Sequence, residues 1–459
     1  MKVRGYFLPP QIKIQELRIL EFDQIQVEVP VLTPDLICRI ADHLITFHER
    51  VLVIRPMDTI LKAIDSTIRK WHRRSDPRRR IALDALPSIT GFSSQMIQRI
   101  MERPWADYRL NKLKALLEDK FLTGCILDEF KKITGGKGRA YGPRLTTHIL
   151  AGNIPGAGIP DLMTAMVLKS SSLVKTSSND PLLPVLFAES LAEVDPELAQ
   201  GLAVLWWKGG DPPVEEAAFS RSDWVIASGD DATIQRIRQR VAGRFIGYGH
   251  RLSFGLIGKE ALKSAKGIAR KAGMDVAMYD QQGCLSPHLF YVETGGIVSP
   301  KVFARLLADE LESLSIKLPR GKISTGSAST LRQLKDTTEM REAAGDEAAV
   351  FCGRKGLDWL VVYEGDSTFV PSPLHRVIRI KPLKDFSLLP SLLQTWSLHL
   401  QAAGVAVSKN RLKAVAEMLG RLGVNRICPI GRMQEPPIGW YQDGRLALTE
   451  MVRWVGLEG

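Results

Sequence analysis

Cys284 lies in the residue pattern best suited to covalent chemistry, YDQQGCLSPHLFYVE, which runs from Tyr279 to Glu293. It follows Gly283 in a polar turn between two β-prone segments, where small neighbours let a substrate approach the thiol. A thiolate is a strong nucleophile, and nearby backbone N–H groups can lower its pKa. The plainer interpretation of a lone cysteine is a buried and inert thiol.

Asn153 offers a second group for the same chemistry, in the segment GNIPGAGIP from Gly152 to Pro160. The preceding residues, LTTHILAGN, predict a buried strand that runs into a loop stiffened by prolines. A rigidly held Asn amide can donate to the oxyanion that forms when a thiolate attacks a carbonyl. An ordinary turn between strand and helix would also use these residues.

A third polar group follows the next predicted strand, in the sequence LVKTSSNDP. Lys175 stands at the end of that strand, and Ser177 and Ser178 come directly after it. An ammonium group and hydroxyls suit a ribose or a phosphate, although a solvated loop is also polar. The chain contains neither G-x-G-x-x-G nor a P-loop, so a dinucleotide would not be held by the common fingerprints.

The elements that carry these groups alternate between strand and helix from residue 145 onward. Predicted strands LTTHIL, SSLVK, LAVLWW and SDWVIAS are separated or followed by predicted helices at 160–169, 182–191 and 232–240. Such alternation indicates βαβ units and a mostly parallel sheet, in which ligands bind at the carboxyl ends of strands. The turns after Asn153, Lys175 and Ser228 are therefore expected to contact a cofactor.

A second αβ pattern begins near residue 252, with strands SFGLIG, HLFYVE and DWLVVYE. We expect helices there at 259–271, 301–313, 385–402 and 411–421. Before residue 130, β-prone runs at 11–31 precede helical spacing at 36–51 and 59–71. The last 34 residues, rich in Pro and Gly, are expected to form a folded-back tail without helix or domain character.

The bulk properties favour an anionic ligand or partner. The net charge is +12 and the sequence pI about 9.4, and residues 70–80, KWHRRSDPRRR, form a basic cluster. That cluster predicts either a solvated helix end or a contact with phosphate or a carrier protein. No nucleic-acid motif accompanies the charge, so we expect no nucleic-acid partner.

The five cysteines exclude two structural roles. They show no CxxC and no Cys/His cluster, which argues against a disulfide framework and a zinc site. No metal is therefore expected. No signal peptide and no run of 18 apolar residues are visible, so we expect a cytoplasmic protein without a membrane span.

The order GNIP, LVKTSS, the SG of VIASGDD and then Cys284 resembles the aldehyde dehydrogenase superfamily. Within it, YDQQGCLSPH and GRMQEPPIGWYQDGR are similar to the long-chain fatty acyl-CoA reductases of the bacterial luminescence type. The resemblance covers roughly residues 145–459. It implies an α/β fold of two Rossmann-like αβα domains with parallel sheets. Residues 1–250 would bind NADP(H), 251–425 would carry the nucleophilic cysteine, and 426–459 would pack as a tail on the first domain or a neighbouring subunit.

The resemblance also implies roles for individual residues. Cys284 would accept the acyl group, and Asn153 would donate to the oxyanion. Lys175 would bind the adenosine ribose or its 2′-phosphate, helped by the serines that follow it. The remaining cofactor contacts, near the pyrophosphate or nicotinamide, would be made by Ser228 and Gly229.

Two departures from the superfamily pattern bear on the reaction. NAD-preferring relatives often carry a Glu where this chain has Ser178. A carboxylate there would repel the 2′-phosphate of NADPH, whereas the serine hydroxyls of this chain would accept it, so the sequence favours NADPH. Hydrolytic relatives also carry a water-activating Glu where this chain reads IGYGHRLSF. His250 is a candidate base in that stretch, and Glu293 is a weaker one.

The expected function is NADPH-dependent reduction of long-chain fatty acyl-CoA to a fatty aldehyde through a Cys-linked acyl thioester. The acyl donor would be acyl-CoA or an acyl-protein, an acyl-protein synthetase is an expected partner, and homo-oligomerisation is usual for the superfamily. Two alternatives stay open: an acyl-relay subunit without redox activity, and an NADP-dependent aldehyde dehydrogenase that works oxidatively.

Overall fold

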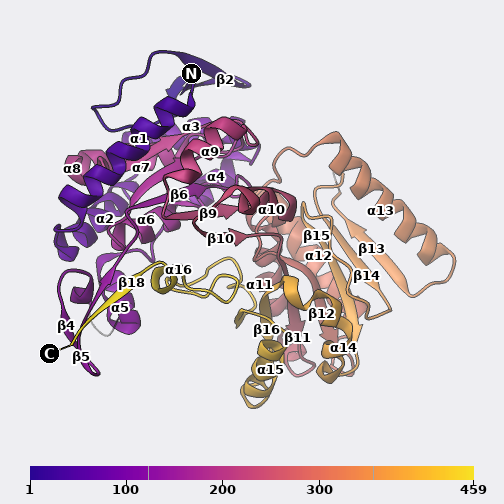
Figure 1. Cartoon of the computed structure of the whole chain (residues 1–459). Coiled ribbons are helices and arrows are strands. Elements are labelled where there is room, and N and C mark those ends of the chain that lie inside the picture. The colour runs from indigo at the N-terminus through magenta and orange to yellow at the C-terminus, as the bar shows by residue number, and fades with distance from the viewer. Residues whose placement is uncertain (122–123, 355, 459) are drawn as a thin grey trace.

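The chain folds into two α/β bodies that lie side by side, and its last residues run back from the second body to the first (Figure 1). The computed structural model describes residues 1–121, 124–354 and 356–458. A small sheet near the N-terminus, in the order β1-β3-β2, lies against the first body. Its strands are β1 (Lys2–Arg4), β2 (Leu17–Phe22) and β3 (Ile25–Pro30).

The first body is built on a five-stranded, wholly parallel sheet in the order β10-β9-β6-β7-β8. Strands β6, β7 and β8 are buried at every position, because helices cover both faces of a parallel sheet. The strands are β6 (Leu145–Ile149), β7 (Ser171–Lys175), β8 (Leu202–Leu205), β9 (Trp224–Ser228) and β10 (Arg244–Tyr248).

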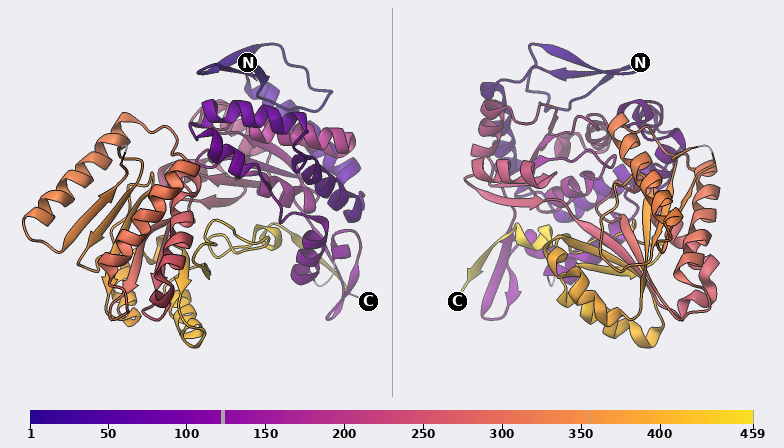
Figure 2. Two further views of the ribbon diagram at one scale, coloured as in Figure 1. Left: turned by 180° about the vertical axis from the view of Figure 1, so that it is seen from behind. Right: turned by 90° about the vertical axis from the view of Figure 1, so that its right-hand side faces the viewer.

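Two helical layers enclose this sheet (Figure 2). Leu173 and Val174, adjacent in β7, belong to different core clusters because side chains alternate across a strand. The Leu173 side is covered by α1 (Pro34–Phe47), α9 (Pro212–Ser220) and α10 (Asp231–Arg240). The Val174 side is covered by α2 (Met57–Trp71), α3 (Pro77–Thr90), α4 (Ser94–Ile100), α5 (Leu110–Phe121), α6 (Ile159–Val167), α7 (Leu183–Val194) and α8 (Pro196–Ala199).

The second body has a seven-stranded sheet in the order β13-β14-β15-β12-β11-β16-β17, parallel except for β13. Helices α11 (Ala265–Ala277) and α12 (Pro300–Lys317) cover one face, α14 (Leu389–Leu393) and α15 (Lys409–Arg421) the other. Helix α13 (Thr325–Ala343) packs beside β13. The strands are β11 (Leu252–Ile257), β12 (Pro287–Glu293), β13 (Ala348–Cys352), β14 (Leu360–Glu364), β15 (Val377–Leu383), β16 (Leu400–Ala406) and β17 (Arg426–Pro429).

A third, antiparallel sheet fastens the end of the chain to the first body. The tail passes through α16 (Ala447–Glu450) and ends in β18 (Arg453–Leu457), which pairs with β5 (Gly136–Tyr141). Strand β5 also pairs with β4 (Lys131–Ile133). The tail therefore crosses from one body to the other, as Figure 1 shows in yellow.

The predicted α/β fold with two parallel-sheet bodies is confirmed, and the strands and helices expected between 145 and 240 form where the sequence places them. One expected helix is wrong: residues 385–402 form only short helical turns, and Leu400 already begins β16. A short apolar run fits a buried strand as well as a helix, so periodicity could not separate them. The helix expected at 259–271 begins instead at Ala265 and extends to Ala277.

Several other elements were not predicted, among them β18 and α13. The tail was expected to be neither a helix nor a domain, but it contains the short helix α16 and the strand β18, which forms because it finds an edge to pair with in β5, about three hundred residues earlier in the chain. Helix α13 buries only Leu331 and Thr338. A helix that is polar on nearly every side has little periodic apolar signal.

Candidate active site

A cavity with a volume of about 1440 Å³ contains Cys284. Four stretches line it: 99–117 around α4 and α5, 154–167 in the loop after β6 and α6, 274–285 from the end of α11 to the cysteine, and 426–448 in the tail. Apolar side chains from all four face the cavity, among them Trp105, Leu116, Ile154, Met278 and Ile438. The cavity is large and apolar enough for a fatty acyl chain.

Cys284 is presented by a loop with an uncommon backbone. A β-prone segment was predicted before it, but α11 precedes it, followed by Tyr279, Asp280 and Gln281 at φ 54°, 49° and 64°. Left-handed conformations cost free energy in residues other than Gly, so surrounding contacts must impose them. Such a loop fixes the direction in which the cysteine leaves the helix.

Buried side-chain contacts impose this conformation. The Asp280 carboxylate pairs with the Arg376 guanidinium at 2.6 Å and accepts the backbone N–H of Gly321 at 2.9 Å. The Gln281 amide donates to the carbonyls of Pro287 and Val377, and its oxygen accepts the N–H of Val377. The residues DQ of the YDQQGC motif therefore tie the loop to the second sheet.

Asn153 meets the cysteine loop from the first body. Its side-chain amide donates to the backbone carbonyl of Gln282 at 2.8 Å. A Cβ on Gly283 would lie 2.9 Å from Ile154 Cδ1, so glycine permits the two loops to approach. The structure thus brings together Asn153 and the cysteine loop, 129 residues apart in the chain.

The Cys284 thiol is held in its protonated form. The residue is half-buried, and burial raises the thiol pKa to about 11, with the Asp443 carboxylate acting in the same direction. The backbone N–H of Cys284 and the guanidinium groups of Arg251 and Arg426 oppose this rise in pKa. The charged groups around the thiol therefore control how readily Cys284 becomes a thiolate nucleophile.

The tail supplies several of these charges. Arg426 donates to the carbonyls of Met433, Arg432 and Glu435 at 2.6, 2.7 and 3.1 Å, which shapes the turn after β17. Further on, the Asp443 carboxylate lies 2.7 Å from Arg251. No pattern in the sequence marked Arg251, Arg426 or Asp443, since their relation to Cys284 depends on the path of the tail.

Asp161 is another carboxyl group that sequence reasoning missed. It lies in the first turn of α6 and lines the cavity together with Tyr108 and Tyr248. Burial raises the pKa of Asp161 to about 7. This cavity therefore holds a carboxyl group able to exchange a proton near neutral pH.

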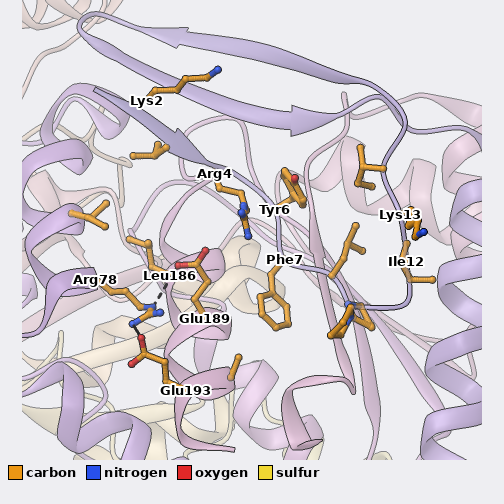
Figure 3. Close-up of a pocket in the computed structure, with 17 residues that line it drawn as sticks. Lys2, Arg4, Tyr6, Phe7, Ile12, Lys13, Arg78, Leu186, Glu189 and Glu193 are labelled. Atoms are coloured by element: carbon orange, nitrogen blue, oxygen red, sulfur yellow. Dashed lines mark ion pairs between the residues drawn. The ribbon is translucent and has the colours of Figure 1, made fainter. Parts of the chain in front are cut away.

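The second cavity, of about 970 Å³, lies under the N-terminal residues 2–14 and beside α3 and α7 (Figure 3). Arg78 pairs there with Glu189 at 3.5 Å and with Glu193. None of its lining residues is a cysteine, so the thiol chemistry belongs to the larger cavity.

Lys175 lies where a phosphate or ribose contact was expected, at the carboxyl end of β7. Burial lowers its pKa, while the Glu215 carboxylate acts in the opposite direction. A Cβ on Gly209, after β8, would lie 3.9 Å from Lys175 Nζ. Without that Cβ, the exposed glycine leaves space for a ligand beside the ammonium group.

The serines after Lys175 are placed differently from each other. Ser177 Oγ accepts the N–H of Asn179 at 3.2 Å and packs so close to Gly152 that a Cβ there would lie 2.1 Å away. Ser177 therefore packs against the start of the Asn153 loop. Ser178 is exposed at the same edge of the sheet.

The two candidates at the end of β9 are also unequal. Ser228 is partly exposed, and Gly229 follows it with its N–H donated to the Tyr248 carbonyl at 3.1 Å. That backbone donor is occupied within the protein. The Ser228 hydroxyl is thus the better placed of the two to contact a ligand.

The two candidate bases lie outside the lining of the cysteine cavity. His250 is exposed, its N–H donates to Asp231 at 2.8 Å, and its ring centre lies 6.4 Å from that of His288. Glu293, at the far end of β12, accepts both terminal nitrogens of Arg411 at 2.7 and 2.9 Å. Its carboxylate is committed to an ion pair.

Within residues 1–121, 124–354 and 356–458, no group of three or more His, Cys, Asp or Glu side chains could hold a metal ion. In the same part of the chain, every helix is too short or too polar to cross a lipid bilayer.

A sequence model of the acyl-CoA reductases, LuxC, matches residues 54–454. The chain belongs to this family. Three long-chain acyl-protein thioester reductases are similar to this chain. The protein from Aliivibrio fischeri is 25% identical over 88% of this chain and 82% of its own length. The protein from Photobacterium leiognathi, named reductase 2, is 24% identical over 96% of this chain and 90% of its own length. The protein from Photorhabdus luminescens is 24% identical over 96% of this chain and 88% of its own length.

Solved structures with the same fold as this LuxC-family chain are aldehyde dehydrogenases. An indole-3-acetaldehyde dehydrogenase complexed with NAD⁺ superposes with a TM-score of 0.75 at 13% identity, over 98% of this chain and 96% of its own. An NADP-dependent glyceraldehyde-3-phosphate dehydrogenase from Bacillus halodurans, complexed with NADP, gives 0.73 at 15%, over 96% of both chains. The predicted family and fold are confirmed.

Proposed function

We propose that this LuxC-family protein reduces long-chain fatty acyl thioesters to fatty aldehydes with NADPH, through an acyl group carried on Cys284. The observation that supports this most is the bond of Asn153 to the loop that carries Cys284, next to a cavity of about 1440 Å³ that is lined by this cysteine and by apolar side chains. The names of the curated relatives, which are thioester reductases, point to the same reaction class.

The first half-reaction transfers the acyl group to the enzyme. The Cys284 sulfur attacks the thioester carbonyl, the bond to the leaving thiol breaks, and the proton lost by Cys284 ends on that thiol. The Arg251 and Arg426 guanidinium groups favour the thiolate needed for attack. Asp161, in the same cavity, is a group that could hold the proton in transit.

The negative charge on the carbonyl oxygen needs donors during this attack. The Asn153 amide donates to the Gln282 carbonyl, in the loop that carries the Cys284 sulfur. It would exchange this bond for one to the oxyanion. The backbone N–H of Cys284, which lies against its own thiol, is the second donor. Removal of one such donor typically slows catalysis by about 10²–10³.

The residues at the carboxyl ends of β7, β8 and β9 fit a dinucleotide. Lys175 with the open space at Gly209 would hold the adenosine ribose and its 2′-phosphate, with Ser178 beside them and Ser228 nearer the reacting end. When bound there, NADPH would supply the hydride that, together with one proton, converts the acyl thioester to the aldehyde and the free Cys284 thiol. We infer NADPH over NADH because no carboxylate stands at position 178 to repel the additional phosphate.

Hydrolysis of the acyl enzyme is expected to be slow. The stretch from Gly247 to His250 contains no carboxylate, and its backbone is held by Asp231 through the N–H of His250. His250 would have to reorient to act as a base. The acyl group is therefore expected to remain on Cys284 until it is reduced, because its hydrolysis is slow.

The same proposal assigns the cofactor to residues 1–250 and the nucleophile to residues 251–425, with the tail 426–459 closing the cavity between them. An acyl-CoA or acyl-protein as donor, an acyl-protein synthetase as partner, assembly as a homo-oligomer and a cytoplasmic location complete it. The relatives' names, which contain acyl-protein thioester, support the donor class.

The experiment compares the wild-type protein with Cys284→Ala. Wild-type protein, NADPH and myristoyl-CoA should give loss of the nicotinamide absorbance matched by fatty aldehyde, and mass spectrometry should find an acyl adduct on Cys284. The variant should lose both activities but still bind NADPH. An adduct without NADPH consumption would indicate the acyl-relay alternative, and oxidation of free aldehyde by NADP without CoA would indicate the oxidative one.

A further inference from the structure

Three exposed arginines form a basic edge beside the cysteine cavity. Arg73 and Arg74 follow the end of α2, and Arg103 lies in the loop between α4 and α5 that lines the cavity. None of the three has an ion-pair partner within the described parts of the chain. We call Arg73, Arg74 and Arg103 the basic rim.

Packing holds the two parts of the basic rim together. His72 Nε2 lies 3.0 Å from the Pro104 carbonyl, and the rings of Trp71 and Trp105 meet edge to face with centres 5.3 Å apart. Residues 72–74 are thereby fixed against the cavity-lining loop 101–109. The chain at Arg73 and Arg74 is therefore held beside the loop that carries Arg103.

The basic rim belongs to a larger charged region, part of which is neutralised or buried. Within the cluster 70–80, Lys70 and Arg78 both pair with Glu193, and Arg79 is buried and donates to the Trp71 carbonyl, whereas Arg80 is exposed. Figure 3 shows Arg78 turned toward its carboxylate partners at the other cavity. In the part of the cavity lining that the tail contributes, Arg432 is paired with Glu435 at 2.7 Å.

The surplus of positive charge affects the pKa of His72, which lies next to the basic rim. The pKa of His72 is lowered by burial, opposed by its bond to the Pro104 carbonyl, and lowered further by Arg109, Arg103 and Arg79. Like charges held together without counter-ions repel one another. An acidic partner would relieve that repulsion.

The depth of the nucleophile restricts the donor. Cys284 is half-buried inside the cavity, so a thioester must reach it on an extended arm. Coenzyme A and small carrier proteins both have one. Arg73 and Arg74 line neither cavity and stand on open surface, whereas a phosphate site needs converging groups. Spread, exposed cations instead match an acidic protein surface.

We propose that the basic rim docks a small acidic carrier protein whose flexible arm delivers the acyl thioester to Cys284. This inference rests on the proposed function. The donor thus binds outside the cavity, on the first body, while its arm enters between the loop 101–109 and the tail.

The test replaces the two rim residues outside the cavity lining, by Arg73→Glu and Arg74→Glu in one full-length variant. The matched control, Lys409→Glu and Lys413→Glu, makes the same change in net charge at exposed positions that line neither cavity. Three donors are compared with NADPH: myristoyl acyl carrier protein, myristoyl-CoA, and the uncharged myristoyl thioester of N-acetylcysteamine.

With the carrier-protein donor, kcat/KM should fall at least about tenfold in the rim variant, since charge complementarity typically accelerates association by about 10 to 10³. The uncharged thioester should react within about twofold of wild type, which also reports a folded active site. The control variant should retain its rate, and added salt should slow only the wild type and the control.

Three results would overturn the inference. Unchanged turnover of the carrier-protein donor would remove the docking role. An equal fall for myristoyl-CoA and the carrier protein would assign the rim to phosphate instead. Loss of turnover of the carrier-protein donor in the control variant would show that the effect comes from overall charge. Fluorescence anisotropy of labelled acyl carrier protein with Cys284→Ala measures docking without turnover, so failure of the proposed reaction is separable from failure of docking.

Discussion

Asp443→Asn should make Cys284 more reactive, although Asp443 lies 159 residues further along the chain. Its carboxylate helps to hold the thiol pKa at about 11 and lies 2.7 Å from Arg251, which acts in the opposite direction. The substitution removes one negative charge and releases one positive charge from its partner. Both changes lower the pKa of the Cys284 thiol.

The size of the effect follows from the thiolate fraction. At pH 7, a pKa of about 11 leaves about one thiolate in 10⁴, against about one in 10² at the ordinary value of 9.0. A more basic thiolate attacks faster with a Brønsted slope of about 0.4–0.5, which returns a factor of about 8. Wild-type Cys284 should therefore be alkylated about tenfold more slowly than an ordinary thiol.

For the variant, each unit by which the pKa falls raises the thiolate fraction about tenfold and lowers its nucleophilicity about threefold. The net gain is about threefold per unit at pH values below the pKa. The alkylation rate of the wild type should rise steadily from pH 7 through pH 10, and that of the variant should level off at lower pH.

The assay is iodoacetamide alkylation at a series of pH values, quantified on the Cys284 peptide by mass spectrometry with glutathione as a reference thiol. Glu435→Gln is the matched control, because Glu435 lines the same cavity but acts on Asp275 and Tyr279. A slower or unchanged Asp443→Asn variant would refute the placement of that carboxylate beside the thiol. Wild-type alkylation as fast as glutathione at pH 7 would refute the burial argument itself.

Two further substitutions address the oxyanion and the cofactor. Asn153→Ala should lower kcat by about 10²–10³ while Cys284 alkylation stays near wild type; single-turnover kinetics would check this, and a fall below tenfold would dismiss Asn153 as a donor. Ser178→Glu should reduce the ratio of kcat/KM for NADPH over NADH by about tenfold or more, through repulsion of the 2′-phosphate. An unchanged ratio would show that position 178 does not contact the cofactor.

The sequence was informative about candidate site residues at the ends of buried strands. Asn153 follows β6 and Lys175 ends β7, and both strands were predicted because short runs of apolar and β-prone residues end in polar turns. Adjacent parallel strands end at the same edge, so local patterns sufficed to place these residues together. Their individual contacts, such as Ser177 with Gly152, were beyond such reasoning.

The sequence was least informative where position depends on long-range packing. The left-handed turn before Cys284 is imposed by Arg376 and Val377, about 96 residues away. Glu293 was predicted as the weaker candidate base, but its carboxylate is paired with Arg411 of α15. Such partners cannot be identified from spacing, because an ion pair leaves no local periodicity.

The sequence by itself determined the α/β class, the family and the identity of the nucleophile candidate, since these depend on residue types and on order along the chain. Only the tertiary structure decided that Cys284 is kept protonated and which charges act on it. Those effects fall off with distance through space and depend on burial. They arise because the tail crosses the cavity and brings Asp443 and Arg426 to a thiol that lies far from them in the sequence.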